Sequence, residues 1–187
     1  MIYIVNKRRK IEGVRAEFPH AEILDLTSSS PFEYGKLLSP FFPHGNIPVP
    51  FSNGVFSASV EGIWQGLKVF ERAGIDTTRF SNTTMKGLKR PVKFYGKPLG
   101  HQKGVFSNEL LGYEEARRLI YLPSYLWVLE NIPKVKAIIE KIKRYSFEND
   151  IVFLDYNTNE DIGNLTQPLS HAALVKLYIL DKYPYGR

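Results

Sequence analysis

The segment Ile151–Asp155 has the sequence IVFLD, a run of four apolar residues that ends in an acid. An uninterrupted apolar run of this length is typical of a strand that is buried on both faces. We expect it to be the central strand of a small sheet, with Asp155 at its end. Residues 2–5 (IYIV) and 21–26 (AEILDL) predict two further strands, because apolar and β-branched residues dominate both.

Helices account for much of the remaining chain. Pro123 and Pro133 each suit the first position of a helix, where the missing N–H group costs nothing. Four helices are expected, at residues 114–122, 123–130, 133–145 and 168–182. Residues 40–54 predict an irregular loop and residues 91–104 a strand followed by a loop, because both are rich in Pro and Gly. The expected fold class is α+β, a single compact helix-rich domain with a small sheet over residues 1–187.

The composition is that of an ordinary globular protein. The chain has 187 residues, of which 43% are hydrophobic and 24% charged, and it contains no cysteine. Disulfides, cysteine-ligated zinc, iron–sulfur clusters and thiol catalysis are therefore excluded, and a cytoplasmic location is the default expectation. No apolar run approaches the roughly 18 residues of a membrane span, so no membrane partner is expected.

Basic residues exceed acidic ones and give the chain a formal net charge of +6. Two clusters concentrate them: Lys7, Arg8, Arg9 and Lys10, and then Lys134, Lys136, Lys141, Lys143 and Arg144. The second cluster lies opposite an apolar stripe of the predicted helix 133–145, which favours a solvated helix face. The overall excess is compatible with a polyanionic partner, such as nucleic acid or a diphosphate-bearing nucleotide.

The segment Ser57–Glu71 (SASVEGIWQGLKVFE) carries the strongest functional pattern. On a helix, Glu61, Gln65 and Lys68 fall within about 60° of one another, with Trp64 on their flank. These residue types also occur on ordinary solvated helix faces. Against that reading, the segment contains two interior glycines, each of which costs roughly 1 kcal/mol relative to alanine in a helix.

These four residues form the motif Glu-x-x-aromatic-Gln-x-x-Lys, which resembles the signature helix of the NADAR domain, the YbiA-like N-glycosidases. The usual form there is Glu-His-aromatic-aromatic-Gln-Ala-x-Lys, and here Gly62 and Gly66 replace the His and the Ala. The likeness extends more loosely over residues 38–182, after the N-terminal strands and turn of residues 1–37. This sequence lacks the Trp-Gly pair that the family has after the acidic residue at the end of a strand.

The resemblance implies hydrolysis of the N-glycosidic bond of a ribosyl or ADP-ribosyl compound, with no metal or other cofactor. The compound would be an ADP-ribosylated nucleotide or nucleic acid, or a riboflavin-pathway intermediate. The expected catalytic acids are Glu61, Asp155 and Asp161, with Glu160 as an alternative to the last two. The expected substrate-binding residues are Trp64, Gln65, Lys68, Phe42 and His44, the last two from the loop that precedes the motif.

A second class of function stays open, a non-catalytic module that binds a nucleotide or nucleic acid through the same residues. Basic and aromatic residues alternate between Arg79 and Phe106 on a stretch rich in Pro and Gly, a pattern that suits phosphate and base contacts. The four histidines have no metal-ligand spacing, and phosphate-loop, dinucleotide and serine-hydrolase motifs are absent from the sequence. The sequence leaves the oligomeric state open.

Overall fold

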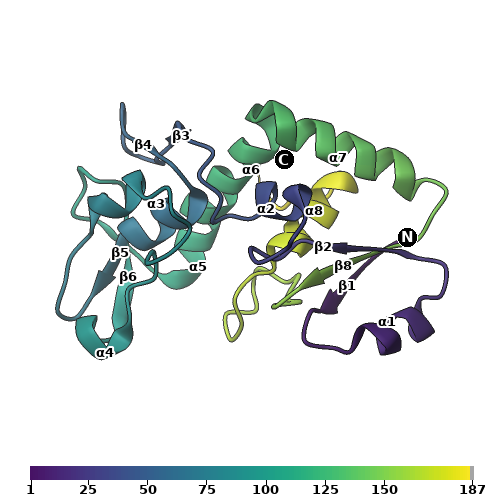
Figure 1. Cartoon of the computed structure of the whole chain (residues 1–187). Coiled ribbons are helices and arrows are strands. Elements are labelled where there is room, and N and C mark those ends of the chain that lie inside the picture. Colours follow the sequence, from purple (N-terminus) through teal and green to yellow (C-terminus); the bar gives the residue numbers. More distant parts are fainter. Residues whose placement is uncertain (186–187) are drawn as a thin grey trace. The chain divides into compact units, whose positions relative to one another are not determined.

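A computed structural model describes residues 1–185 and divides the chain into two compact units (Figure 1). Unit 1 consists of Met1–Ser39 and Leu129–Arg187, and unit 2 is Pro40–Val128. The predicted α+β class is confirmed, since the described chain contains both helices and small sheets. The expectation of one domain over residues 1–187 stays a prediction, and the two units are described separately.

Unit 1 is built on a three-stranded parallel sheet. Its strands are β1 (Ile2–Asn6), β8 (Ile151–Asp155) and β2 (Glu22–Asp25), in the order β1-β8-β2. All five residues of β8 are buried, so the predicted central strand is confirmed. Because the strands are parallel, their carboxyl ends meet at one edge, where Asn6 pairs with Asp155 and Asp25 with Leu154.

Four helices belong to unit 1: α1 (Ile11–Glu17), α2 (Glu33–Leu37), α7 (Pro133–Ser146) and α8 (His171–Ile179). Helix α7 begins at the predicted proline and buries the apolar side of its surface, with its basic residues mostly exposed on the other side. The prediction that the last helix begins at Pro168 is wrong. Ser170 caps α8 by accepting a hydrogen bond from the Ala173 N–H at 3.1 Å, so the helix begins at His171.

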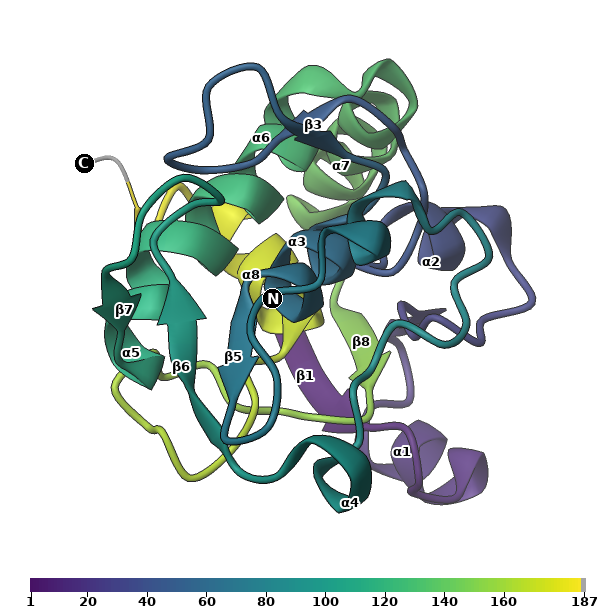
Figure 2. The same cartoon turned by 90° about the vertical axis from the view of Figure 1, so that its left-hand side faces the viewer.

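Unit 2 contains two small antiparallel sheets (Figure 2). The first pairs β3 (Ile47–Pro48) with β4 (Phe56–Ser57), and the second has the order β5-β6-β7. The strands of the second sheet are β5 (Lys68–Phe70), β6 (Pro98–Gln102) and β7 (Leu110–Leu111). The helical elements of unit 2 are α3 (Val60–Gly66), the 3₁₀ turn η1 (Thr77–Ser81), α4 (Val92–Tyr95), α5 (Tyr113–Ala116), the π-helical turn η2 (Arg117–Tyr121) and the start of α6 (Leu122–Asn131).

The helix that the sequence places across residues 57–71 is shorter than predicted. Ser59 caps α3 by accepting a hydrogen bond from the Gly62 N–H at 3.0 Å, and the helix ends at Gly66. A Cβ atom on Gly66 would lie 2.3 Å from the Phe80 ring, so this glycine permits a close approach. The chain then pairs as β5 with β6, which places Lys68 on a strand and not on the helix.

Two further local predictions are wrong. Residues 92–95 form the one-turn helix α4, where an extended segment was expected; Gly96, at φ +80°, ends it. The helix predicted to stop before Pro123 instead runs on through η2 into α6. A π-helical turn is wider than an α-helical one, and it accommodates the proline ring without breaking the helix. Across residues 1–185, no helix has the length and apolar character that crossing a membrane requires.

Candidate functional site

Helix α3 places an acid and an amide side by side in the interior of unit 2. Glu61 is 7% exposed and Gln65 5% exposed, so the alternative of a solvated helix face is wrong for both. The Gln65 Nε2 group donates a hydrogen bond of 2.8 Å to Glu61 Oε1, one helical turn away. Within residues 1–185 the other carboxyl oxygen, Oε2, accepts no hydrogen bond, so it is available to a ligand or a water molecule.

Charge and burial oppose each other at Glu61 and Lys68. Burial raises the pKa of Glu61 above its usual value, and this outweighs the Gln65 hydrogen bond and the positive charges of Lys68 and Lys89. Burial likewise lowers the pKa of Lys68, helped by the neighbouring charges of Lys89 and Arg90 and opposed by Glu61. Among the described residues, Glu61 and Lys68 form no ion pair in direct contact, so they interact through space.

An aromatic cluster surrounds Trp64 on the neighbouring side of α3. Its indole ring lies 3.7 Å from the His101 ring, 5.6 Å from Tyr121 and 5.9 Å from Tyr113, measured between ring centroids. The Lys68 ammonium is 5.5 Å from the centroid of the same indole, a cation–π distance. Trp64 and Lys68 are only partly buried, so the cluster extends from the buried Glu61 toward the surface of unit 2.

Three different elements bring these rings to Trp64. His101 lies directly opposite Lys68 in the β5-β6 pair, so both side chains project from the same face of that sheet. Tyr113 begins α5 and Tyr121 ends the π-helical turn η2. The sequence analysis did not predict that any of these three rings contacts Trp64. One signal was available: Pro123 interrupts a helical pattern directly after Tyr121, and irregular helical turns are frequent at functional sites.

His101 is the least expected member of this cluster. It lies on β6 and is 2% exposed, so its imidazole belongs to the interior of unit 2. Neither ring nitrogen has a hydrogen bond of acceptable geometry within the described chain, although the Trp64 carbonyl is close enough to raise the pKa slightly. Burial, with the nearby Lys68 charge, lowers the pKa of His101 to about 3, so the imidazole is neutral at neutral pH.

The loop before α3 supplies two of the predicted binding residues. Phe42 and His44 are half-buried, and their rings lie 4.8 Å apart between centroids. The loop is tied to the helix at its start, where the Glu61 N–H donates to the Pro40 carbonyl at 2.9 Å. Lys89 lies 6.0 Å from the Phe41 ring, and its charge also acts on Glu61. The contact of Phe42 and His44 with a substrate stays a prediction.

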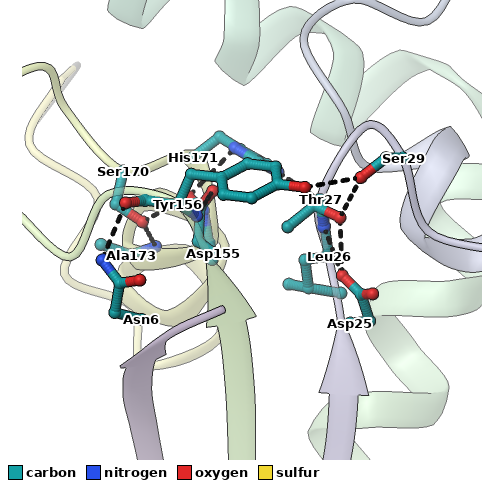
Figure 3. A network of polar contacts seen from close by, with 11 residues as sticks. Asn6, Asp25, Leu26, Thr27, Ser29, Asp155, Tyr156, Ser170, His171 and Ala173 are labelled. Carbon is teal, nitrogen blue, oxygen red and sulfur yellow. Dashed lines mark hydrogen bonds and ion pairs between the residues drawn. The ribbon is translucent and has the colours of Figure 1, made fainter. Parts of the chain in front are cut away.

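Asp155 and Asp161, the other predicted acids, belong to unit 1. Asp155 is buried, and Figure 3 shows it at the end of β8 within a polar network. Its Oδ2 atom accepts a hydrogen bond from Ser170 Oγ at 2.7 Å and lies 3.2 Å from His171 Nδ1, and its Oδ1 atom accepts from the Tyr156 N–H at 2.7 Å. The carboxyl is thus engaged by protein groups, which favours a structural role.

Asp161 lies between β8 and α8, outside any helix or strand. It is exposed, and its carboxyl accepts a hydrogen bond from the Gly163 N–H at 2.8 Å, closing a local turn. The neighbouring Glu160 pairs with Lys176 at 2.9 Å. A catalytic role for either acid stays a prediction. Residues 1–185 contain no group of three or more His, Asp or Glu side chains placed to hold a metal ion.

These features define an α+β protein with a buried carboxyl group beside a lysine and an aromatic cluster. The chain belongs to a family of unknown function, DUF6939, whose pattern matches residues 6–175. That match spans most of both units, including α3, β5 and β8. No curated protein and no solved structure matches the chain.

Proposed function

We propose that the protein hydrolyses the N-glycosidic bond of a ribosyl or ADP-ribosyl compound, with Glu61 as the catalytic carboxyl group. The observation that carries this proposal is the burial of Glu61 beside Lys68, Gln65 and the Trp64 cluster. A buried carboxyl with a raised pKa is costly for stability, and such groups concentrate at functional sites. The likeness of residues 61–68 to the NADAR signature suggests the type of reaction.

The proposed reaction needs one water molecule and one well-placed carboxylate. The bond between C1′ of the ribose and the base nitrogen breaks, and its electron pair leaves with the nitrogen. The ionised Glu61 stabilises the positive charge that develops on the ribose, and it accepts a proton from the water that forms the new C1′–O bond. Returning that proton to the departing nitrogen completes the hydrolysis and restores Glu61. A raised pKa makes Glu61 a stronger base than an exposed glutamate.

The neighbouring residues have distinct roles in this proposal. Gln65 fixes the orientation of the Glu61 carboxyl through its 2.8 Å hydrogen bond, which leaves Oε2 to act. Trp64 offers a ring face on which a base can stack, held in place by His101, Tyr113 and Tyr121. Lys68 supplies a positive charge for a phosphate of the substrate.

A panel of candidate substrates tests the proposal. We would incubate the full chain with ADP-ribosylated nucleotides, ADP-ribosylated DNA and riboflavin-pathway ribosyl phosphates, and measure released base and sugar by chromatography. The Glu61→Gln variant should lose about 10²-fold or more in turnover while binding the substrate within a few-fold of the parent. Trp64→Ala should mainly weaken binding. Parental turnover in Glu61→Gln would exclude Glu61 as the catalytic group.

The second candidate function is ligand binding without chemistry. The lysine–indole contact between Lys68 and Trp64 favours it, because a cation beside a ring face can bind a nucleotide without any bond being broken. Tight binding of ADP-ribose with no turnover across the whole substrate panel would support this alternative over the hydrolase.

A further inference from the structure

The positive charge of the chain is concentrated in unit 2. Residues 40–128 contain eleven Lys and Arg against six Asp and Glu, which gives a net charge of +5 out of the total of +6. The buried Arg90 donates to the backbone carbonyls of Lys68 and Gly74. Within the described chain, six further cations form no ion pair with a carboxylate: Lys68, Arg72, Lys86, Lys89, Lys93 and Lys97. Unit 2 therefore has an excess of available positive charge that its own acids do not neutralise.

Several lysines of unit 2 lie beside aromatic rings. Two of these pairs involve strongly exposed phenylalanines and are separate from the Glu61 site. Lys93 lies 5.9 Å from the centroid of Phe94, which is 67% exposed, and Lys103 lies 5.5 Å from that of Phe51, which is 49% exposed. An aromatic ring beside a cation is the combination that proteins use to stack a base and contact a phosphate of single-stranded nucleic acid.

The two lysine–phenylalanine pairs lie at opposite ends of strand β6. Lys93 and Phe94 belong to α4, just before the strand begins, whereas Lys103 follows its last residue (Figure 2). Phe51 reaches that second end because Gly104, at φ +79°, lets the two backbones approach: a Cβ on Gly104 would lie 2.3 Å from the Phe51 carbonyl oxygen. The five-residue strand between the pairs is itself roughly 13–17 Å long.

We propose that Lys93, Phe94 and Lys97 before β6, together with Lys103 and Phe51 at its other end, bind single-stranded nucleic acid. Their spacing suits a strand of a few nucleotides whose phosphates contact the lysines and whose bases stack on the phenylalanines. Phe106, 76% exposed in the loop after β6, adds a third ring near the second end. Lys103 is held by Glu109 at 3.0 Å, but an exposed ion pair of this kind is weak and a phosphate can compete with it.

Single strands fit these residues better than other polyanions. In a duplex the bases are already stacked and paired, so exposed rings on the protein gain little from it. A membrane surface would require one contiguous apolar patch, whereas Phe94 and Phe51 lie at opposite ends of β6. Acidic protein segments satisfy the lysines but leave the rings without a stacking partner. The proposal is independent of the proposed hydrolase activity, because it involves none of the residues assigned to the Glu61 site.

Fluorescence anisotropy with a labelled 20-nucleotide oligothymidine tests the proposal on the full chain. We expect binding that weakens roughly tenfold or more between about 50 and 200 mM salt, since about three phosphates are contacted. The double variant Lys93→Ala/Phe94→Ala should bind about tenfold more weakly. The matched control is Lys141→Ala/Phe147→Ala in unit 1, which removes the same charge and a ring that is also strongly exposed (78%). It should bind within twofold of the parent.

Four outcomes would overturn this proposal. They are no binding at 50 mM salt, equal affinity for the oligothymidine as a duplex with its complement, equal losses in the two double variants, or tighter binding to vesicles of anionic lipid than to the oligonucleotide. Circular dichroism melting of each variant checks that it is folded. Glu61→Gln should bind the oligonucleotide like the parent, because Glu61 is not among the proposed nucleic-acid contacts. The hydrolase proposal can therefore fail while the nucleic-acid proposal stands, and the reverse.

Discussion

The ring of His171 bridges the carboxyl of Asp155 and the backbone of β2. Its Nδ1 atom lies 3.2 Å from Asp155 Oδ2, and its Nε2 atom lies 2.6 Å from the carbonyl oxygen of Leu26. The carbonyl oxygen and an ionised carboxylate both accept hydrogen bonds, and the charge of Asp155 raises the pKa of His171 against burial, so this arrangement favours a ring that is protonated on both nitrogens. This ion pair joins the end of β8, the chain after β2 and the start of α8 within unit 1 (Figure 3).

The free energy of unfolding should depend on pH through the Asp155–His171 pair. Burial lowers the pKa of His171, but the charge of Asp155 outweighs burial and raises the pKa above the usual 6.5. The protonated ring therefore stabilises the fold below about pH 6.5, and this stabilisation is lost as the pH rises through the raised pKa. The pKa of Asp155 is lowered despite burial, so its stabilisation is lost only in acid. Denaturant melts should therefore show maximal stability between about pH 4 and 6.5 and a decline above that range. In His171→Gln the alkaline decline should shrink, whereas the control His20→Gln, at an exposed histidine, should keep it.

Removing the Asp155 charge should destabilise unit 1. Asp155→Asn leaves the His171 imidazolium buried without its counter-charge, and breaking a buried pair typically costs about 3–5 kcal/mol in the free energy of unfolding. Urea unfolding at pH 6 measures this loss. Asp150→Asn, at a partly exposed strand-flanking acid, is the control and should change the free energy by less than about 1 kcal/mol. A variant that keeps parental stability but loses turnover would instead support the catalytic role predicted for Asp155.

Glu61→Gln should increase stability while it lowers turnover. The folded protein holds the Glu61 proton more tightly than the unfolded chain does, so the ionised group destabilises the fold as the pH rises above about 4.5. At pH 8 we expect the free energy of unfolding to rise by about 1 kcal/mol, because glutamine can still bond to Gln65 without carrying charge. At pH 4 the variant and the parent should be nearly equal. A loss of stability at pH 8 would show that the ionised carboxylate supports the fold.

The rate of the proposed hydrolysis should depend on pH through Glu61 and Lys68. A base must be ionised to act, so kcat/KM should rise with pH through a Glu61 pKa above the usual 4.5. It should fall again as Lys68 loses its charge, at a pH below the usual 10.5. Lys68→Arg should move the alkaline limb upward, because arginine stays charged. An alkaline limb that does not move in Lys68→Arg would assign it to another group.

His101→Phe should preserve the ring stack on Trp64 and improve stability. The substitution removes two buried ring nitrogens that lack good hydrogen bonds, and each such group costs about 1–3 kcal/mol. Because phenylalanine is somewhat larger, we expect a net gain of about 1 kcal/mol in the free energy of unfolding. His101→Ala should lose stability by about 2 kcal/mol, because it leaves a cavity beside the indole. A destabilised His101→Phe would indicate that buried water satisfies the ring nitrogens.

Several features of this protein were determined by the sequence itself. The run IVFLD is buried on both sides as the central strand β8, because no polar residue interrupts it before Asp155. Pro133 begins α7, and the apolar positions Val135, Ile139 and Ile142 turn inward with the helical period. Glu61 and Gln65 share a helix face because they are four residues apart. All these patterns rest on contacts between residues that are close in the chain.

Tertiary structure decided the rest. Residues 68–70 follow a helical pattern, yet pairing with β6 makes them a strand, because strand pairing depends on a partner about 30 residues away. The same pairing brings His101 opposite Lys68 and beneath Trp64, which nothing local to His101 indicates. The contact between Asp155 and His171 likewise could not be predicted locally, because the histidine lies 16 residues downstream. Local patterns determine which face of an element is apolar, whereas burial and the choice of partner depend on what the rest of the chain places against it.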